Sequence, residues 1–434
     1  MNLAGKTVTV LGAGRSGRAA VALALRGGAR VRVFDAAPRI EGMPDGVEIH
    51  PSAGEASARD GQCDLLVVSP GIDTYGPLVA AFSACAGEMI GEVEFACRHF
   101  EGKIIAITGT NGKTTTTELV ERILKAGGID GVACGNYGVP VCEVVMRDPA
   151  PEVLALEASS FQLETVVDFK PDVAVWLNFA PDHMDRYPSV EKYKAAKLRI
   201  FENQRATETA VVRKGEDLPD LEAKVVSFST DDESADWFSD GRYLMHRGQS
   251  LIDLEQGSHL RGKHNAENAM AAIAACKVLG VDDETIHKAL DGYAPPRHRC
   301  ELVRTLDGVE WLNDSKATNL HALESALRSQ TRPVVLIAGG KDKGLDYRPV
   351  LPLLAEKARA AVTFGQISGS LAELFSHAVP VEPVGTLDEA IDAARRHCVR
   401  GGTVLFSPGT SSFDQFDGYE QRGDTFCRIV QKLR

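Results

Sequence analysis

A lysine and a run of threonines follow a glycine turn in residues 107–120, ITGTNGKTTTTELV, between a predicted strand and a predicted helix. Gly109 and Gly112 let backbone N–H groups turn towards phosphate oxygens, and the start of the helix adds partial positive charge. Lys113 can neutralise the outer phosphates of a nucleotide, and Thr114 offers a hydroxyl group to Mg²⁺. An ordinary glycine turn is the alternative, but the pattern predicts a nucleotide site. Its candidate residues are Gly109, Thr110, Asn111, Gly112, Lys113, Thr114 and Thr115.

A second glycine turn, Gly12-Ala-Gly14-Arg-Ser-Gly17, follows a predicted strand much earlier in the chain. Asp35 ends the next predicted strand, where an acidic residue can bond a ribose. The pair is typical of an NAD enzyme, which is one interpretation. However, this module ends near residue 92, about half the length of a full dinucleotide-binding fold, and the phosphate loop already supplies a nucleotide site. A substrate that itself carries a nucleotide diphosphate explains both turns.

Polar side chains at the ends of predicted strands are candidate metal ligands. Glu157 ends the strand in EVLALEASS, and NFAPDHMDRY brings together Asp182, His183 and Asp185. Parallel sheets bind ligands at the carboxyl ends of their strands, and Mg²⁺ prefers oxygen ligands from few protein groups. Glu157 is therefore a candidate Mg²⁺ ligand. Taken singly, each acidic residue is more readily a surface charge, and His183 is as readily a structural histidine.

Lysines form the remaining candidates. KYKAAKLRIF contains Lys192, Lys194 and Lys197, and a solvated basic helix face is the favoured interpretation of these three. Lys316 in WLNDSKATN and Lys343 in AGGKDKG follow predicted strands, at loop positions where a lysine suits phosphate or carboxylate groups. A solvated lysine in a glycine loop is the alternative for Lys343.

The composition of the chain limits its class. A length of 434 residues allows two to four domains. The net charge of −12 and the lack of a lysine or arginine block argue against nucleic acid as a partner. Nine cysteines without a paired spacing favour reduced thiols in the cytoplasm. No apolar run approaches the roughly 20 residues of a membrane span, and the N-terminus enters a strand at once, so no membrane anchor or signal peptide is expected.

Short apolar runs alternate with helical patterns, which predicts parallel α/β layers. Strands are expected at 7–12, 30–35, 64–72, 103–108, 152–160 and 172–180, and in VEWLNDS, PVVLIAGG, AAVTFG and TVLFSP. A helix should begin near Ser16 and end at Gly27, and another should follow the phosphate loop and end at Gly127. The stretch 203–260 is strand-like, and 262–280 predicts an amphipathic helix. Pro295-Pro296 breaks any helix and indicates a hinge.

The motifs GTNGKTT, LEASSFQLE, NFAPDHMDRY, YKAAKLRIF, KHNAEN, HRCE, NDSKATN and SPGTSSFDQF occur in an order that resembles the Mur ligase family over the whole chain. NDSKATN and DHMDRY favour the member that adds D-glutamate to UDP-N-acetylmuramoyl-L-alanine. The resemblance implies three α/β domains. These are a Rossmann-like UDP-substrate domain at 1–92, a P-loop ATPase-type domain at 93–294 and a Rossmann-like amino-acid-binding domain at 295–434. The short phosphate loop, with Ile107 where longer loops have glycine, is the form this family uses.

The resemblance implies a reaction and a set of roles. ATP would activate the substrate carboxylate as an acyl phosphate, which the glutamate amine attacks, in cytoplasmic peptidoglycan precursor synthesis for cell-wall growth, shape and division. The catalytic residues would be Lys113, His183, Lys197 and Lys316, and Asn268, Arg299 and Asp314 would join the phosphate loop in binding ATP. Two Mg²⁺ sites are implied, one at Thr114 and Glu157, the other at His183 and a carbamylated Lys197. The muramoyl nucleotide would contact Gly14, Arg15, Ser16, Asp35, Ser69, Gly71, Asn136, Ser159 and Gln162, and glutamate would contact Thr318, Lys343, Ser412 and Phe413.

Some features depart from the family pattern. Arg15 replaces an aliphatic residue, Ala36 stands where a hydroxyl is common, and SPGTSSFDQF replaces the commoner Ala-Cys-Ala version, which leaves the uridine contacts open. Alternative functions are another Mur-type or folylpolyglutamate-type ligase, an NAD(P) oxidoreductase with an accessory nucleotide domain, and a non-enzymatic nucleotide-binding regulator. The expected partners are the three small substrates alone, with a monomeric chain.

Overall fold

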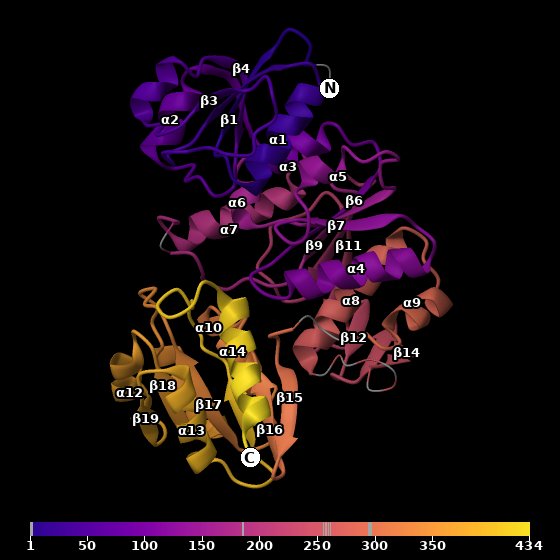
Figure 1. The fold of residues 1–434 in the computed structure, drawn as a ribbon. Helices are drawn as coiled ribbons and strands as arrows, with labels where there is room; N and C mark the ends of the chain where they lie inside the picture. The colour runs from indigo at the N-terminus through magenta and orange to yellow at the C-terminus, as the bar shows by residue number, and fades with distance from the viewer. Residues whose placement is uncertain are drawn as a thin grey trace. The chain divides into compact units, whose positions relative to one another are not determined.

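The computed structural model describes residues 3–184, 186–254, 256, 258, 260, 262–293 and 297–434 (Figure 1). The chain divides into two compact units, Met1–Tyr293 and Ala294–Arg434. Pro295-Pro296, which the sequence indicates as a hinge, and Asp185 of the expected acidic cluster both lie outside the described residues.

The first unit begins with a five-stranded parallel sheet of strand order β3-β2-β1-β4-β5. Its strands are β1 (Thr7–Leu11), β2 (Arg30–Phe34), β3 (Glu48–His50), β4 (Cys63–Val68) and β5 (Ala86–Gly91). The three strands predicted here are confirmed. The sheet is longer than the predicted half of a dinucleotide-binding fold, because β4 and β5 continue it beyond β1. β3 and β5 contain few β-branched residues, so the sequence signal for them is weak.

Short helices connect these strands: α1 (Arg15–Arg26), the 3₁₀ helix η1 (Glu55–Arg59), α2 (Pro77–Ser83) and α3 (Glu92–Cys97). α1 buries a face that includes Ala20 and Leu23, and it ends at Gly27 as predicted. Gly28 follows with φ of +82°, which a glycine adopts without strain. α1 and α3 pack against α5 (Val141–Val144), and one apolar core runs from this sheet into the next.

A nine-stranded sheet of order β14-β13-β12-β11-β10-β9-β6-β8-β7 forms the rest of the first unit. Its strand pairs are parallel except for β12–β13 and β13–β14, which are antiparallel. The strands are β6 (Lys103–Thr108), β7 (Gly131–Gly135), β8 (Val153–Glu157), β9 (Val173–Trp176), β10 (Thr209–Arg213), β11 (Lys224–Ser229), β12 (Trp237–Ser239), β13 (Tyr243–His246) and β14 (Gln249–Asp253). The strands predicted near 103, 152 and 172 are confirmed as β6, β8 and β9, which are neighbours. Their carboxyl ends therefore meet at one edge of the sheet.

Helices cover this sheet: α4 (Lys113–Ala126), α6 (Ser160–Leu163), α7 (Val190–Leu198), the 3₁₀ helix η2 (Arg199–Phe201), α8 (Lys263–Val278) and α9 (Asp283–Leu290). The predicted helix at 262–280 forms as α8, but the prediction that this helix is amphipathic is wrong. Residues 268–276 are all buried, because α8 packs on α4 and on the β9–β12 side of the sheet at once (Figure 1). A helix enclosed on several sides is apolar all round, and alanine allows the close approach.

The second unit is built on a six-stranded sheet of order β15-β16-β20-β17-β18-β19, antiparallel only between β15 and β16. Its strands are β15 (Glu301–Leu306), β16 (Val309–Asn313), β17 (Val334–Gly339), β18 (Ala358–Phe364), β19 (Val381–Pro383) and β20 (Thr403–Phe406). The helices are α10 (Leu320–Arg328), the 3₁₀ helix η3 (Arg348–Val350), α11 (Leu351–Lys357), α12 (Ser368–Phe375), α13 (Leu387–His397) and α14 (Tyr419–Lys432). Apolar clusters lie on both faces of this sheet. The α/β class with three mainly parallel sheets is thus confirmed, and no described helix is long and apolar enough to cross a bilayer.

Candidate active site

The phosphate loop joins β6 to α4, and its shape requires its glycines. Gly109 and Gly112 have φ of +153° and +87°. A Cβ atom at Gly112 would lie 2.2 Å from Oδ1 of Asn268, and one at Gly109 would lie 2.9 Å from Cβ of Leu177. α4 then begins without a side-chain cap, so the first backbone N–H groups of the helix can bind an anion. The same close approach places Asn268 of α8 beside the loop.

Residues after β9 hold the loop in place. Thr110 donates its backbone N–H to the carbonyl oxygen of Asn178 at 2.9 Å and its hydroxyl to that of Ala180 at 3.0 Å. The backbone N–H of Asn111 donates to Oδ1 of Asn178 at 2.9 Å. The Lys113 amine folds back and donates to the carbonyl oxygens of Gly109 and Thr110 at 2.8 and 2.9 Å. Thr114 is half-buried and Thr115 is buried.

Glu157 at the end of β8 has a carboxylate oxygen suited to a cation. The residue is 2% exposed, and its Oε1 accepts a hydrogen bond of 2.7 Å from the side-chain amide of Asn136. The backbone N–H of Asn136 also donates to the carbonyl oxygen of Glu157 at 2.9 Å. Oε2 is buried and accepts no hydrogen bond from any described residue. A buried carboxylate oxygen without a donor is costly, and a bound cation removes that cost.

Lys197 on α7 is buried against the phosphate loop. It is 1% exposed, and its amine donates to the carbonyl oxygen of Gly109 at 2.9 Å. Burial, assisted by the charge of Lys113, lowers the pKa of Lys197 well below its usual value, although Asp182 and Glu157 act in the opposite sense. A neutral amine with a free electron pair is a nucleophile, which an ammonium group is not.

The prediction of a solvated lysine face on this helix is wrong for one member. Lys192 is exposed, and Lys194 pairs with Asp217 at 2.6 Å, but Lys197 points into the site. The sequence did not reveal Tyr193, whose ring centre lies 5.0 Å from the Lys197 amine and whose hydroxyl lies 3.4 Å from that of Thr110. The two residues are four apart, so a helix places both on one face, which is the signal that was available.

His183 lies in the turn after β9 in a left-handed backbone conformation, with φ of +58°. Its backbone N–H donates to Oδ1 of Asp182 at 2.8 Å, and its Nε2 lies 3.8 Å from Oδ2 of that carboxylate. The ring is 4.9 Å from that of Phe161 and 5.9 Å from that of Tyr193. His183 and Lys197 therefore share Tyr193 as a neighbour. Within the described part of the chain, no group of three or more His, Cys, Asp or Glu side chains forms a metal cluster.

Two further predicted residues, Ser159 and Gln162, bind each other at the start of α6. The Ser159 hydroxyl donates to Oε1 of Gln162 at 3.0 Å and accepts from its backbone N–H at 3.3 Å. This reciprocal cap fixes the short helix next to Glu157 in the chain.

The glycine turn after β1 is braced by two of its predicted ligand residues. The carboxylate of Asp35 accepts from the backbone N–H groups of Ala13 and Ala37 at 2.6 and 2.8 Å. The Ser69 hydroxyl donates to the carbonyl oxygen of Gly12 at 3.1 Å. α1 begins after Gly14 without a side-chain cap, which leaves N–H groups for an anion. Of the remaining predicted residues, Gly14, Arg15 and Gly71 are exposed and Ser16 is half-buried.

In the second unit, three loops follow the adjacent strands β16, β20 and β17. Lys343 donates to the carbonyl oxygen of Thr318 at 3.4 Å, and Ser412 is 2% exposed in the loop after β20. The loops of Thr318 and Lys343 are thus neighbours, and the glutamate pocket itself stays a prediction. Phe413 is 64% exposed, whereas the aromatic ring beside Lys316 belongs to Tyr419, at 3.7 Å from its amine.

Asp314, predicted to face ATP, is buried at the start of the first of these loops. It accepts from the backbone N–H of Cys300 at 3.2 Å and from the Ser407 hydroxyl at 2.8 Å. Burial raises the pKa of Asp314 to about 7, against these hydrogen bonds and the charge of the half-buried Arg299. These contacts connect the loop after β16 to the chain after β20.

Arg422 of α14 is a residue of this region that the sequence did not single out. It is fully buried and donates to the hydroxyl and carbonyl oxygens of Ser315 at 3.0 and 2.7 Å. It also donates to the carbonyl oxygen of Thr410 at 3.1 Å. Burial lowers the pKa of Arg422 to about 9, so the guanidinium still carries its charge at neutral pH. One buried cation thus joins the loops of Lys316 and Ser412.

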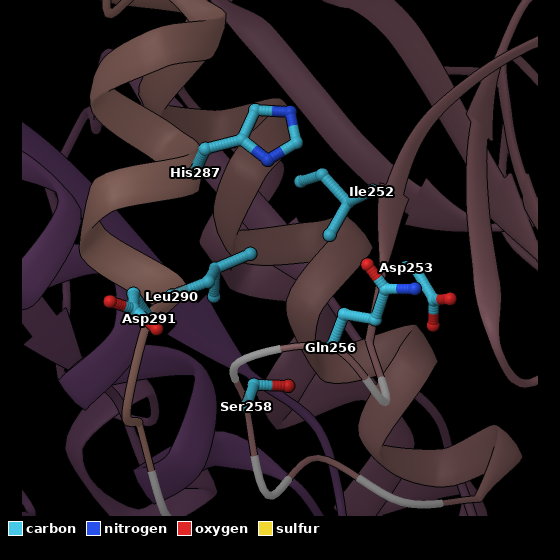
Figure 2. A pocket seen from close by; sticks show the side chains of 7 residues that line it. All are labelled: Ile252, Asp253, Gln256, Ser258, His287, Leu290 and Asp291. Atoms are coloured by element: carbon cyan, nitrogen blue, oxygen red, sulfur yellow. The ribbon is translucent and has the colours of Figure 1, made fainter.

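A cavity of about 260 Å³ lies elsewhere in the first unit, between β14 and α9 (Figure 2). Its lining consists of Ile252, Asp253, Gln256, Ser258, His287, Leu290 and Asp291. None of the predicted site residues lines it, and Asp253 already pairs with Arg242 at 2.8 Å. This cavity is therefore distinct from the phosphate-loop site.

Three family models match the chain in sequence. They are "Mur ligase MurD-like, N-terminal domain" at residues 6–91, "Mur ligase middle domain" at 107–276 and "Mur ligase, glutamate ligase domain" at 298–409. The phosphate loop, Glu157, His183 and Lys197 all fall in the second match, and Asp314, Lys316 and Lys343 fall in the third.

Curated relatives match over nearly their whole length. The protein named UDP-N-acetylmuramoylalanine--D-glutamate ligase of Chlorobium phaeobacteroides (strain BS1) is 38% identical, over 99% of this chain and 98% of the relative. The protein of the same name in Geobacter metallireducens is 38% identical, over 100% and 99%.

Solved structures share the fold at lower identity. The MurF ligase of Thermotoga maritima in complex with ADP has a TM-score of 0.62 at 16% identity, covering 99% of this chain and 96% of that one. A pseudomurein peptide ligase type C of Methanothermus fervidus also has a TM-score of 0.62, at 15% identity, covering 99% and 100%. At the identity and coverage of its curated relatives, this chain belongs to the Mur ligase family.

Proposed function

We propose that this chain is an ATP-dependent ligase that joins D-glutamate to UDP-N-acetylmuramoyl-L-alanine in peptidoglycan synthesis. Full-length relatives that bear the name of this activity support the assignment. The structural observation that carries it is the group of buried polar residues at the phosphate loop. There, the buried Lys197 bonds to the glycine turn that would receive the phosphates of ATP, and the charge of the buried Glu157 acts on Lys197.

The residues at this site fit Mg²⁺. Oε2 of Glu157 is buried and accepts no hydrogen bond from the part of the chain that the structure describes. Thr114 follows Lys113 in the first turn of α4, so Glu157 and Thr114 would hold one ion. His183 and a carbamylated Lys197 would hold a second. The neutral Lys197 amine can add to CO₂ with formation of an N–C bond and loss of a proton, which gives a carboxylate-like group. Bound Mg²⁺ would neutralise charge on the phosphate oxygens.

The chain's own residues prepare the transfer of the terminal phosphoryl group. The substrate carboxylate attacks the terminal phosphorus of ATP, ADP leaves, and an acyl phosphate forms. Lys113 would exchange its bonds to the loop carbonyls for bonds to the outer phosphates, where its charge offsets the charge of the transferring group. The glutamate amine then attacks the acyl carbon, phosphate leaves, and the amine loses a proton.

The three ligands would occupy different parts of the fold. The uridine diphosphate would contact Gly14, Arg15, Ser16, Asp35, Ser69 and Gly71. Asp35 and Ser69 also hold the glycine turn in shape. Asn136, Ser159 and Gln162 would face the muramoyl part, and Asn268 would face the adenine. Glutamate would contact Thr318, Lys343, Ser412 and Phe413, the last of which is exposed. Arg299 and Asp314 would contact ATP. The three domains would span residues 1–92, 93–294 and 295–434.

Phosphate release measured with the full chain tests this function. Release should require ATP, UDP-N-acetylmuramoyl-L-alanine and D-glutamate together, and should fail with L-glutamate, L-alanine or L-lysine. Lys113→Ala should abolish turnover while the thermal melt is retained. Release with L-lysine instead of D-glutamate would assign a different ligase of the family, and a nicotinamide-dependent absorbance change without phosphate release would assign an oxidoreductase.

A further inference from the structure

Arg186 lies in the turn that carries His183. The backbone N–H groups of Arg186 and Tyr187 both donate to the carbonyl oxygen of His183, each at 3.0 Å. His183 itself adopts φ of +58°, a conformation that a non-glycine residue keeps only when its surroundings enforce it. The position of the Arg186 backbone therefore helps to determine the orientation of His183.

The side chain of Arg186 reaches the loop that follows β4 of the first sheet. Its guanidinium donates to the carbonyl oxygens of Pro70 and Ile72 at 3.0 and 2.7 Å. These two residues flank Gly71 in the loop after β4, which also contains Ser69. The hydroxyl of Ser69 bonds in turn to Gly12 in the glycine turn. The backbone of residues 69–72 thus joins the hydrogen bond to the glycine turn with the hydrogen bonds to Arg186 in the His183 turn.

A carboxylate holds the same loop from a second direction. Glu164, just after α6, lies 3.4 Å from the Arg186 guanidinium and accepts a hydrogen bond from the hydroxyl of Thr74. The Glu164 side chain is 4% exposed and that of Arg186 is 14% exposed, so this pair is shielded from water. The guanidinium carbon also lies 4.1 Å from the ring centre of Phe161, which stacks on Tyr187. Ionic pairs shielded in this way are far less screened than surface pairs.

We propose that Arg186 is a positioning residue that keeps loop 69–72 and the His183 turn in one fixed arrangement. On the proposed function, loop 69–72 would bind the nucleotide diphosphate end of the substrate. The His183 turn would contribute a Mg²⁺ ligand at the site where the substrate carboxylate attacks ATP. The Arg186 guanidinium would then fix the distance between the nucleotide site and the reaction site. Binding of the nucleotide end would therefore also place the substrate carboxylate for attack. Remote binding free energy used in this way raises kcat and not only affinity.

Arg199 provides a matched control. It also donates to backbone carbonyl oxygens, those of Leu163, Glu164 and Val166, and it is half-buried. None of these acceptors belongs to the first sheet or to the His183 turn, and the contact with Glu164 is to its backbone oxygen and not to the carboxylate that meets Arg186. Arg186→Lys and Arg199→Lys therefore both remove a guanidinium group that donates to several backbone carbonyl oxygens. Only Arg186→Lys breaks the connection between loop 69–72 and the His183 turn. A lysine keeps the charge and loses the two-pronged geometry.

Steady-state kinetics of the full chain provide the first test, with UDP-N-acetylmuramoyl-L-alanine compared with N-acetylmuramoyl-L-alanine, which lacks the nucleotide. Arg186→Lys should reduce the kcat/KM advantage of the nucleotide substrate by about tenfold, a change equal to about 1.4 kcal/mol. The KM for ATP should stay within about twofold of wild type. Arg199→Lys should keep the nucleotide advantage within about twofold. Equal losses with both substrates, or equal effects of the two variants, would overturn the proposal.

Amide hydrogen exchange provides a second test that does not need turnover. In the wild type, UDP should protect peptides from loop 69–74 and also peptides from the turn that follows residue 182. Arg186→Lys should retain the first protection and lose the second, and Arg199→Lys should retain both. If UDP protects the distant turn equally in Arg186→Lys, the arginine does not connect the segments. An inactive wild type with this exchange pattern would contradict the proposed reaction while leaving the positioning role intact.

Discussion

The amine nitrogen of Lys197 lies 2.9 Å from the carbonyl oxygen of Gly109, so a buried lysine of α7 meets the phosphate loop directly. The residues are far apart in the sequence, and the lysine is 1% exposed. A buried ammonium group is costly unless it is paired, which explains why the pKa of Lys197 lies well below its usual value. Burial of Lys197 against the loop therefore favours the neutral form of an amine close to where ATP would bind.

Lys197→Ala should lose nearly all turnover, and added short carboxylic acids should restore part of it. The reason is that an acid such as formate can supply the two oxygens that a carbamylated lysine would present to Mg²⁺. Lys192→Ala is the control, because Lys192 is exposed on the same helix. Phosphate release measures both. A fully active Lys197→Ala enzyme, or a wild type that never incorporates labelled CO₂, would contradict the second metal site.

Glu157→Gln should raise the Mg²⁺ concentration needed for half-maximal rate by at least tenfold. Glutamine still accepts a hydrogen bond from Asn136 but offers no negative charge, and oxygen ligands with charge hold Mg²⁺ best. The exposed Glu143 gives the control variant Glu143→Gln. Magnesium titrations of phosphate release make the comparison. An unchanged midpoint in Glu157→Gln would show that this carboxylate does not bind the ion.

Lys343→Ala should raise the KM for D-glutamate roughly ten- to hundredfold, if KM follows affinity. Loss of one charge-assisted hydrogen bond to a carboxylate costs about 1.5–3 kcal/mol. The KM values for ATP and the muramoyl nucleotide should change little. Lys341→Ala, in an exposed position of the same loop, is the control. A parallel rise of all three KM values would indicate general damage to the fold, and no rise would make Lys343 a surface charge.

Arg422→Lys should lower the free energy of unfolding of the second unit by about 2 kcal/mol, because a lysine cannot make the three hydrogen bonds to Ser315 and Thr410. It should also raise the KM for D-glutamate, since both loops carry predicted glutamate residues. Denaturant melts and kinetics measure the two effects. The exposed Arg428 on the same helix gives the control variant Arg428→Lys. A variant with wild-type stability would show that the buried cation does not hold these loops.

Glu92→Gln should change how stability depends on pH. Glu92 is buried, its Oε1 accepts from the backbone N–H of Cys142 at 2.7 Å, and burial raises its pKa from 4.5 to about 7. Between these values the folded state binds a proton that the unfolded state has released, so this residue's contribution to stability falls as pH rises from 4.5 to 7 and then stays constant.

The size of this contribution is about 3 kcal/mol across that window. The glutamine variant keeps the acceptor and cannot ionise. Its stability relative to wild type should therefore increase by that amount between pH 4.5 and pH 7.5, as measured by denaturant unfolding at each pH. Glu101→Gln, at an exposed position, should show no such trend. A pH-independent difference for Glu92→Gln would mean that the carboxyl ionises normally in the folded protein.

The sequence by itself determined the class of fold, the phosphate loop and the family. These features are local: β-branched runs form strands, and Gly109 and Gly112 adopt conformations that glycine tolerates. The ends of α1 at Gly27 and of α4 at Gly127 could be predicted for the same reason. Such backbone preferences depend on residues that are neighbours in the sequence, so they can be predicted without knowing which elements pack together.

Tertiary structure alone decided which polar side chains become buried. Lys192 and Lys197 are lysines five residues apart on one helix, yet one is exposed and the other is buried against the phosphate loop. The sequence of α8 does not show which elements enclose it, and no pattern shows that Arg186 reaches the loop after β4. Burial depends on elements that are distant in the chain. Because desolvation sets both the pKa of an amine and the strength of an ion pair, the chemistry of these residues follows from packing.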